Sequence, residues 1–362
     1  MKSFGILQHS LQHEMDYVSK LSEAGIDLGF DVYRFSPNQH SSHHIQGLKY
    51  EPLQKDWVKT NFKVPEFIYD RCFHSGSTTK KETAFIRWLK TESNATFLGH
   101  GLPGKWEIYK HLKKSPLLNR HIPQSIKLHP HTCAKVLSDL LTEHGKIILK
   151  PIIGSQGNGI MLLTQNQDQI GVQINHNGRI FHHTYDKTSS LLKMIRSILK
   201  QRDYIAQQWL SLLDQNNRPF DRRVVMKKTS YTTWEEIGRA TRVGNPESFV
   251  SNLHSGGTIQ TDQKLLMSES VFHQAESIIS RLSHCVATIL EETFSPLFEL
   301  GLDFGIDRSG KVWLLEANSK PGHKAIRSHQ DYYTIPFYYC HSLISEKKGV
   351  NCYGCNSSIK KG

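Results

Sequence analysis

The fold of this chain is constrained most by two short apolar segments, FELGLDFGID at 298–307 and KVWLLEAN at 311–318. Their length, and the turn residues DRSG between them, predict a β-hairpin. Side chains two residues apart on a strand point to the same face. We therefore expect Glu316 and Asn318 to share a face with Val312 and Leu314.

The turn decides which residues of the two strands face each other. If it centres on Ser309-Gly310, Asp303 lies opposite Glu316, whereas another turn shifts the pairing by one residue. Two carboxylates and the Asn318 amide on one face would repel unless a hard cation such as Mg²⁺ bound between them. The alternative is a surface hairpin with solvated acids, which these apolar strands disfavour. Glycines on both sides of Asp303 would leave the face open to a bulky ligand.

A glycine-rich turn, KPIIGSQGNGI, lies between two other apolar strands. Its glycines at 154, 157 and 159 would let backbone N–H groups close over phosphates. The spacing fits neither the P-loop nor the dinucleotide fingerprint, so an ordinary Gly-rich hairpin is the alternative. Lys150 ends the preceding strand, where its ammonium could meet a phosphate, and Lys105 at the start of an earlier helix could supply a second charge.

The rest of the chain alternates strand-like and helix-like segments. SFGILQ, FDVYRFS and FIYDRC predict strands, and the helical spacing of MDYVSKLSEAGIDLG between the first two favours a small α/β domain with a parallel sheet. KWEIYKHLKK and CAKVLSDLLTEHG predict helices, as does a long segment at about 266–293, and residues 221–262 are β-rich. The chain of 362 residues is long enough for two or three domains.

Composition excludes several classes of protein. With 38% hydrophobic and 22% charged residues, the chain is not of a disordered type. The formal charge of +12 suits anionic partners, but the basic residues are dispersed and no basic–aromatic motif indicates nucleic-acid binding. The start MKSFGILQHSLQHEMD lacks the apolar core of a signal peptide, and no stretch could span a bilayer, so we expect an intracellular protein.

The six cysteines are too scattered for a disulfide framework. Cys352 and Cys355 form a C-x-x-C pair that, with Cys340 and His341, could bind zinc. A polar tail with incidental thiols is the reading that we favour.

Together, Lys105, Lys150-Pro151 with GSQGNG, and Asp303 followed by Glu316-Ala317-Asn318 resemble the ATP-grasp superfamily of ATP-dependent ligases. The resemblance implies an α+β ATP-grasp fold, in which two subdomains grip ATP, preceded by a small α/β pre-ATP-grasp domain. It also implies the residues at the site. The phosphate and lid residues would be Lys105, Lys150, Gly154, Ser155, Gln156, Gly157, Asn158 and Gly159, the adenine contacts Gln207, Gln208, Trp209 and Leu210, and the Mg²⁺ ligands Asp303, Glu316 and Asn318.

The resemblance also suggests how the chain is divided. The expected parts are an N-terminal domain at 1–100, a helical connector at 101–148, a lid subdomain at 149–210, a C-terminal subdomain with the metal site at 211–345 and a polar tail at 346–362.

Within that superfamily, VPEFIYDR, KWEIYKHL, FDRRVVM, GRATRVG and SNLHSGG resemble the YheC/YheD family of endospore coat-associated proteins. This likeness implies a place in or near the spore coat, with coat proteins as partners. It implies no particular substrate.

One departure concerns the arginine that many ATP-grasp ligases carry two residues before the first metal carboxylate. Gly301 stands there in this chain. Arg223, Arg239 and Arg242 are the candidates to replace it, because each offers a permanently charged, planar donor group.

Two functions follow as hypotheses. The first is an ATP- and Mg²⁺-dependent carboxylate–amine ligase acting through an acyl phosphate, with an amino acid or peptide as substrate. The second, motivated by Gly301, is a catalytically silent ATP-grasp scaffold that serves as a structural coat protein.

Overall fold

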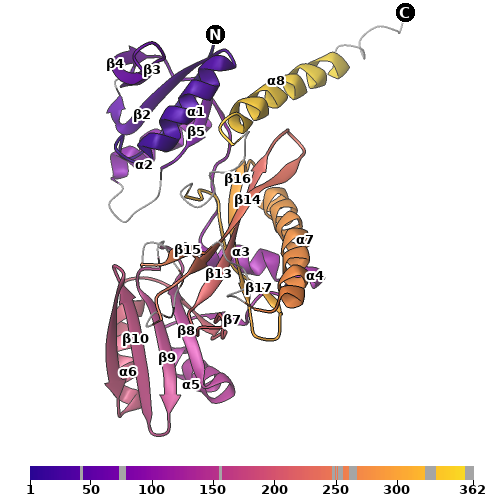
Figure 1. Ribbon diagram of the computed structural model, residues 1–362. Helices are drawn as coiled ribbons and strands as arrows, with labels where there is room; N and C mark the ends of the chain where they lie inside the picture. Colours follow the sequence, from indigo (N-terminus) through magenta and orange to yellow (C-terminus); the bar gives the residue numbers. More distant parts are fainter. Residues whose placement is uncertain are drawn as a thin grey trace, which may run out of the picture.

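The computed structural model describes residues 1–362 apart from 41–43, 73–78, 155–156, 247–248, 250, 252–255, 261–266, 323–331 and 355–362. The strands of the described residues form three sheets, two of six strands and one of five. Figure 1 shows these sheets one after another along the molecule, with the N-terminal sheet at one end and the five-stranded sheet in the middle.

The N-terminal sheet has the strand order β4-β3-β2-β1-β5-β6. As predicted, its centre is parallel: β1 pairs with β2 and β5, and β5 pairs with β6. The sheet extends beyond these predicted strands, because β3 and β4 add two antiparallel strands to its edge. The strands are β1 (Lys2–Leu7), β2 (Phe30–His40), β3 (Ile45–Glu51), β4 (Asp56–Phe62), β5 (Phe67–Asp70) and β6 (Thr96–Phe97).

Helices cover both faces of this sheet. Helices α1 (Met15–Asp27) and α8 (Ile335–Gly354) share one hydrophobic core with it, and α2 (Lys80–Thr91) packs on the opposite face. A capping box between Thr79 and Glu82 begins α2. Phe337 of α8 lies 4.7 Å from Phe4 and 5.0 Å from Phe30 between ring centroids. The end of the chain thus returns to the N-terminal domain, and α8 continues to Gly354, past residue 346, where a polar tail was expected to begin.

The second sheet is antiparallel, in the order β11-β10-β9-β8-β12-β7. Helices α5 (Cys133–His144) and α6 (Thr188–Leu199) share its core. Because β7 pairs with β12, the second half of the segment expected as a helical connector contributes to this sheet. The strands are β7 (Ser125–Lys127), β8 (Lys146–Pro151), β9 (Ile160–Asn166), β10 (Gln169–His176), β11 (Arg179–Tyr185) and β12 (Tyr204–Gln208).

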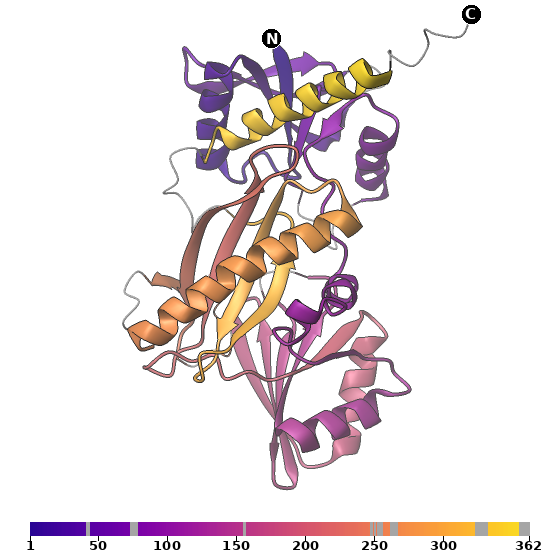
Figure 2. The same ribbon diagram turned by 90° about the vertical axis from the view of Figure 1, so that its right-hand side faces the viewer.

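The third sheet, in the order β15-β14-β13-β16-β17, contains the predicted hairpin. Figure 2 shows the long helix α7 running across one face of it. Helices α3 and α4 pack beside α7 against the same core. The elements are α3 (Lys105–Leu112), α4 (Pro116–Asn119), β13 (Phe220–Lys228), β14 (Trp234–Val243), β15 (Thr258–Gln260), α7 (Glu269–Phe294), β16 (Glu299–Ile306) and β17 (Val312–Asn318).

The hairpin register is as predicted at its polar end: Asp303 pairs with Glu316. The prediction that Glu316 and Asn318 share a face with Val312 and Leu314 was wrong. Phe304 pairs with Leu314 and Asp303 with Glu316, so β17 carries one extra residue, a β-bulge, between them. The extra residue reverses the alternation, so Val312 and Leu314 pack in the core under α7 while the carboxylate turns to the other face.

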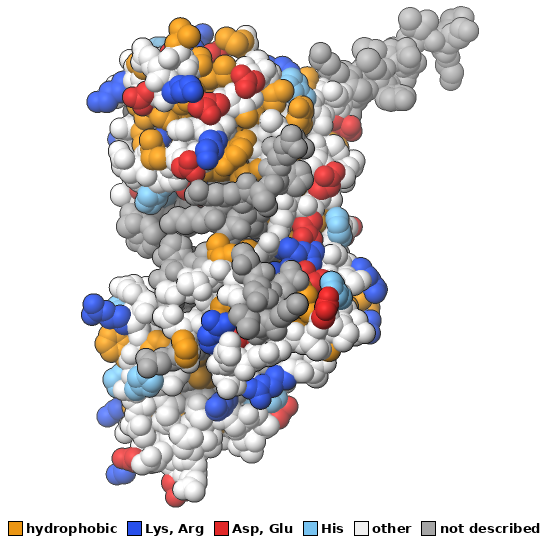
Figure 3. All heavy atoms as spheres, viewed as in Figure 1, with side chains coloured by type: hydrophobic (Ala, Val, Ile, Leu, Met, Phe, Trp, Pro, Cys, Tyr) orange, Lys and Arg blue, Asp and Glu red, His pale blue; other side chains and the backbone are white. Residues whose placement is uncertain are grey.

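Charged side chains of both signs are interspersed on the face shown in Figure 3, and the basic surplus does not gather into one patch there. None of the helices in the described part of the chain is long and apolar enough to cross a membrane.

Candidate nucleotide and metal site

The predicted metal ligands lie on the face of the third sheet opposite α7. Asp303 pairs with Glu316, and Gly301, two residues before Asp303, pairs with Asn318, so the three polar side chains project from adjacent positions. Asp303 is buried, while Glu316 and Asn318 are partly exposed. The corner thus has one enclosed and two accessible oxygen-bearing side chains, the type of donor that Mg²⁺ takes together with phosphate oxygens.

Two arginines of the neighbouring strands hold Asp303. Arg223 of β13 donates from Nε and Nη2 to both carboxylate oxygens, the second at 2.8 Å. Arg242 of β14 lies 2.9 Å away through Nη2 and also donates to Asp221 at 2.7 Å. Burial opposes ionisation of Asp303, but the two guanidinium groups hold its pKa below the ordinary value. The carboxylate is therefore charged at neutral pH.

Arg223 lies beside the position where the expected arginine is missing. A Cβ placed on Gly301 would be 3.2 Å from Arg223 Nη1 and 2.8 Å from the Pro321 side chain. No larger residue fits at 301 without a shift of these neighbours. Gly301 thus leaves room for a guanidinium supplied from the adjacent strand.

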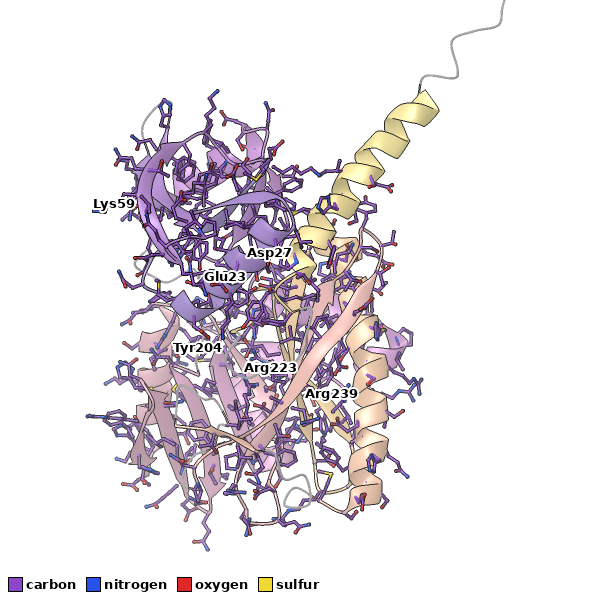
Figure 4. All side chains as sticks on the ribbon, turned by 45° about the horizontal axis from the view of Figure 1, so that its top comes forward. Glu23, Asp27, Lys59, Tyr204, Arg223 and Arg239 are labelled. Carbon is purple, nitrogen blue, oxygen red and sulfur yellow. The ribbon has the colours of Figure 1, made fainter. Side chains whose placement is uncertain are left out.

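The structure does not bring Arg239 to this site. Arg239 donates to Glu276 at 2.7 Å and to Ser280 at 2.7 Å, and both belong to α7. It also pairs with Glu236 on its own strand. Figure 4 shows Arg239 beside α7 and Arg223 nearer the middle of the molecule. Among the three candidate arginines, only Arg223 and Arg242 face the carboxylates, because side chains alternate along β14.

Lys105 joins the metal corner to the glycine-rich turn. Its Nζ lies 3.2 Å from Glu316 Oε1 and donates to the Gly154 carbonyl at 2.6 Å. Its backbone N–H donates to Ile152 at 3.1 Å, so the start of α3 is tied to the end of β8. A lysine in the first turn of a helix is unfavourable to the helix dipole. This position nevertheless places the Lys105 ammonium beside Glu316, a predicted metal ligand, and beside Gly154 of the glycine-rich turn.

Lys150 is the second lysine, at the end of β8. Its Nζ donates to Gln207 Oε1 at 2.7 Å. The Gln207 amide is oriented in turn by donating to Ser125 Oγ at 2.8 Å. Burial lowers the pKa of Lys150 to about 8, and the charge of Lys105 acts in the same direction, while Glu316 and Asp303 oppose them. These mutual effects place both lysines and both carboxylates in one electrostatic neighbourhood.

The glycine-rich turn connects β8 to β9, as predicted, although Ser155 and Gln156 lie outside the described residues. Gly157 and Gly159 have φ angles of 73° and 77°, which favour glycine. A Cβ on Gly159 would also meet the Arg202 guanidinium at 2.8 Å. Asn158 donates to Asn177 in the β10–β11 turn at 3.0 Å. The far side of the turn is therefore held by the second sheet.

The expected adenine contacts lie at the end of β12 and directly after it, and they have different surroundings. The Gln208 amide oxygen accepts from the Gln124 backbone at 3.2 Å, and the Trp209 N–H donates to the Lys146 carbonyl at 3.3 Å. The Trp209 ring packs against a small cluster of Ile148, Leu162 and Phe249. The Leu210 carbonyl accepts from the Leu212 N–H at 3.0 Å. Of the four, only Gln207 lines the pocket described next.

A pocket open to solvent is lined by Lys105, Lys150, Gln207 and Glu316. Its remaining lining is almost entirely hydrophobic. Sequence reasoning missed the apolar wall, although Ile205 shares a strand face with Gln207 two residues on and could have been found. Leu315 depends on the bulge and could not. The remaining lining residues are Ile108, Tyr109, Leu112, Ile122, Leu314 and Ala317.

Two residues of the zinc alternative, Cys340 and His341, are described with their surroundings. Cys340 is buried in the core between α8 and the N-terminal sheet, and burial raises the pKa of its thiol. His341 lies 3.2 Å from Lys2 Nζ. Cys355 lies outside the described residues, so the structure does not test the four-ligand set.

The fold and the site together define an ATP-grasp protein. D-alanyl-alanine synthetase A from Vibrio cholerae superposes with a TM-score of 0.54 at 10% identity, over 95% of this chain and 99% of that one. The ADP complex of N5-carboxyaminoimidazole ribonucleotide synthetase superposes with a TM-score of 0.51 at 11% identity, over 89% of this chain and 71% of that one. These likenesses show the shared fold.

The sequence narrows the class further. A profile of the family described as YheC/D like ATP-grasp matches residues 94–343. The endospore coat-associated protein YheC of Bacillus subtilis is 30% identical over 370 residues, which cover 97% of this chain and 99% of that protein. The chain belongs to the YheC/D-like ATP-grasp family.

Proposed function

We propose that this protein is an ATP- and Mg²⁺-dependent carboxylate–amine ligase that acts through an acyl phosphate. The observation that carries the proposal is a pocket that Lys105, Lys150 and Glu316 line together with mostly apolar side chains. Asp303 is paired with Glu316 on the adjacent strand. The lysines and the carboxylates, through a metal ion, would bind the triphosphate of ATP, and the apolar wall would pack against its adenine ring.

The donor set fits Mg²⁺. Asp303, Glu316 and Asn318 offer only hard oxygen ligands, and two or three such ligands with phosphate oxygens are the usual way in which proteins hold this ion. Bound there, Mg²⁺ would neutralise charge on the phosphates. Lys105 and Lys150 would contact phosphate from the opposite side, and Gly154 to Gly159 would close over it.

In the reaction, an oxygen of a substrate carboxylate bonds to the γ-phosphorus of ATP while the bond from that phosphorus to ADP breaks. An amine nitrogen then bonds to the acyl carbon, phosphate leaves and the amine loses a proton. This chain contributes mainly positioning and charge. We assign to Arg223 the role of stabilising the negative charge on the transferring phosphoryl group, because it lies beside both Asp303 and Gly301. Arg242 braces Asp303 through its own pair with Asp221.

The substrates are proposed as a class: an amino acid or peptide carboxylate and an amine. The coat-associated name of the Bacillus subtilis relative supports a place in or near the spore coat for this protein as well. A silent scaffold was motivated by the absent arginine at 301, and the position of Arg223 removes much of that motive.

The test is phosphate release from ATP and Mg²⁺ in the presence of a library of amino acids and acidic peptides. Stimulation by one substrate class is the expected result. Glu316→Ala should abolish it, whereas Glu235→Ala, which removes an exposed carboxylate of β14, should not. A folded Glu316→Ala protein that still binds Mg-ATP as wild type does would contradict the site. Wild-type protein with no calorimetric heat for Mg-ATP would favour the scaffold.

A further inference from the structure

The segment that follows β17, Ser319–Pro321, is held by the N-terminal domain. The Pro321 carbonyl accepts from Arg71 Nη2 at 2.9 Å. Lys320 Nζ contacts Asp70 Oδ1 at 2.7 Å and donates to the Cys72 carbonyl at 2.6 Å. Asp70 ends β5, and Arg71 and Cys72 follow it directly. We call these three consecutive residues the β5 clamp.

Arg71 also holds the other strand of the hairpin. Its Nη1 donates to Glu299 Oε1 at 2.6 Å, and Glu299 begins β16 four residues before Asp303. Tyr69 donates to the second Glu299 oxygen at 2.8 Å. One side chain therefore ties together the start of β16 and the residues just after β17. These are the two ends of the hairpin that carries Asp303, Glu316 and Asn318.

The Arg71 guanidinium is itself firmly placed. Its side chain is 0% exposed and its Nη2 donates to Glu14 Oε1 at 2.6 Å. Its backbone N–H donates to the Leu7 carbonyl at 2.8 Å, at the end of β1. Donors spread over three acceptor groups in a buried, planar fork define an orientation as well as a charge.

Through Pro321, Arg71 is also linked to the face of the third sheet that carries Asp303 and Arg223. Pro321, whose carbonyl Arg71 holds, packs against Gly301 closely enough that an added Cβ would be 2.8 Å away. Gly301 is paired with Asn318 and lies beside Arg223. A shift of Pro321 would therefore reach Asn318 and the Arg223–Asp303 pair.

We propose that Arg71 is a positioning residue for the metal site, through which the N-terminal domain sets Asn318, Glu316 and Asp303 at the spacing that Mg²⁺ requires. The proposal rests on the proposed function. Arg71 acts through the hairpin ends and touches neither nucleotide nor metal ligand. Loss of the Arg71 side chain should weaken the binding of Mg²⁺, and the part of ATP binding that depends on Lys105 and Lys150 should remain.

The experiment measures ATP affinity by calorimetry in EDTA and across a Mg²⁺ titration, using the full chain. Arg71→Met should raise the half-saturating Mg²⁺ concentration at least tenfold and change the metal-free ATP affinity less than twofold. The Mg²⁺ midpoint of Arg71→Lys should lie between those of wild type and Arg71→Met. An ammonium keeps the charge but lacks the planar guanidinium that contacts Glu299 and Pro321 together. The matched control is Arg34→Met, which removes another buried arginine of the same domain, bonded to Gln8 and Leu11. It should lower the melting temperature without moving the Mg²⁺ midpoint.

A folded Arg71→Met protein with the wild-type Mg²⁺ midpoint would overturn the proposal. If Arg71→Met does not fold, Lys320→Met decides, since it breaks the clamp at a partly exposed side chain. It should raise the midpoint several-fold, and an unchanged midpoint overturns the proposal. Wild-type protein that binds ATP equally with and without Mg²⁺ would refute the proposed function and this inference with it. A Mg²⁺-dependent wild type with unaffected variants would refute the inference alone.

Discussion

Lys105 Nζ lies 3.2 Å from Glu316 Oε1, so a lysine expected to bind phosphate is paired with a carboxylate expected to bind metal. The two residues come from the start of α3 and the end of β17. Under the proposed function, Mg-ATP would compete with this ion pair for both side chains, and the competition can be measured.

Glu316→Gln should have opposite effects with and without metal. In EDTA, ATP affinity should rise about two- to fivefold, because Lys105 is released from a partly exposed ion pair. With Mg²⁺, affinity should fall below that of wild type, because a metal ligand is lost. Calorimetry under both conditions checks this crossover, and a variant that weakens ATP binding equally in both would contradict it.

ATP binding should depend on pH through Lys150, whose pKa burial lowers to about 8. Below pH 8 the amine carries its charge, and above it the charge is lost, so affinity should fall as the pH rises from 7 to 9. Because one proton is involved and the protonated fraction of Lys150 falls about tenfold over this range, the decrease in affinity should be at most about tenfold. The Lys150→Arg protein keeps its charge throughout and should lose this pH dependence. A wild-type profile that is flat over this range would refute the assignment.

Arg223→Met and Arg239→Met form a matched pair, because the two arginines lie on adjacent strands and face opposite sides of one sheet. The Arg223 variant should lose about 10²–10³ in turnover, the range found when a charge-stabilising donor is removed. The Arg239 variant should keep its turnover but melt earlier, since Glu276 loses one of its two arginine partners. Turnover and thermal melts distinguish the two, and equal losses of turnover would contradict the placement of Arg239.

Gly301→Ala tests the crowding beside Arg223. The new methyl group would meet Pro321 and the Arg223 guanidinium, so we expect a loss of about 1–3 kcal/mol in the free energy of unfolding together with reduced turnover. For Gly305→Ala on the same strand, the three atoms nearest to the new methyl group all belong to the Leu212 side chain. This substitution should cost stability without the same loss of turnover. Denaturant unfolding and phosphate release measure both variants, and full turnover in Gly301→Ala would argue against a role for Arg223.

The sequence alone was sufficient for the parts of the site that depend on neighbours in the chain. The hairpin and the glycine-rich turn after Lys150 follow from strand periodicity and turn chemistry, which act over a few residues. The pairing of Asp303 with Glu316 was predicted correctly, but the bulge at Leu315 is what produces it. The family resemblance followed from the same short motifs.

Only the tertiary structure decided the rest. The bulge beside Leu315 reversed the expected faces of β17, because its cost is repaid by packing Val312 and Leu314 under α7. The choice of Arg223 over Arg239 depends on which side of a sheet each strand presents. The Arg71 contact joins β5 to Pro321, residues 250 positions apart in the chain. Such contacts form between surfaces that meet only after folding, so no local pattern of residues encodes them.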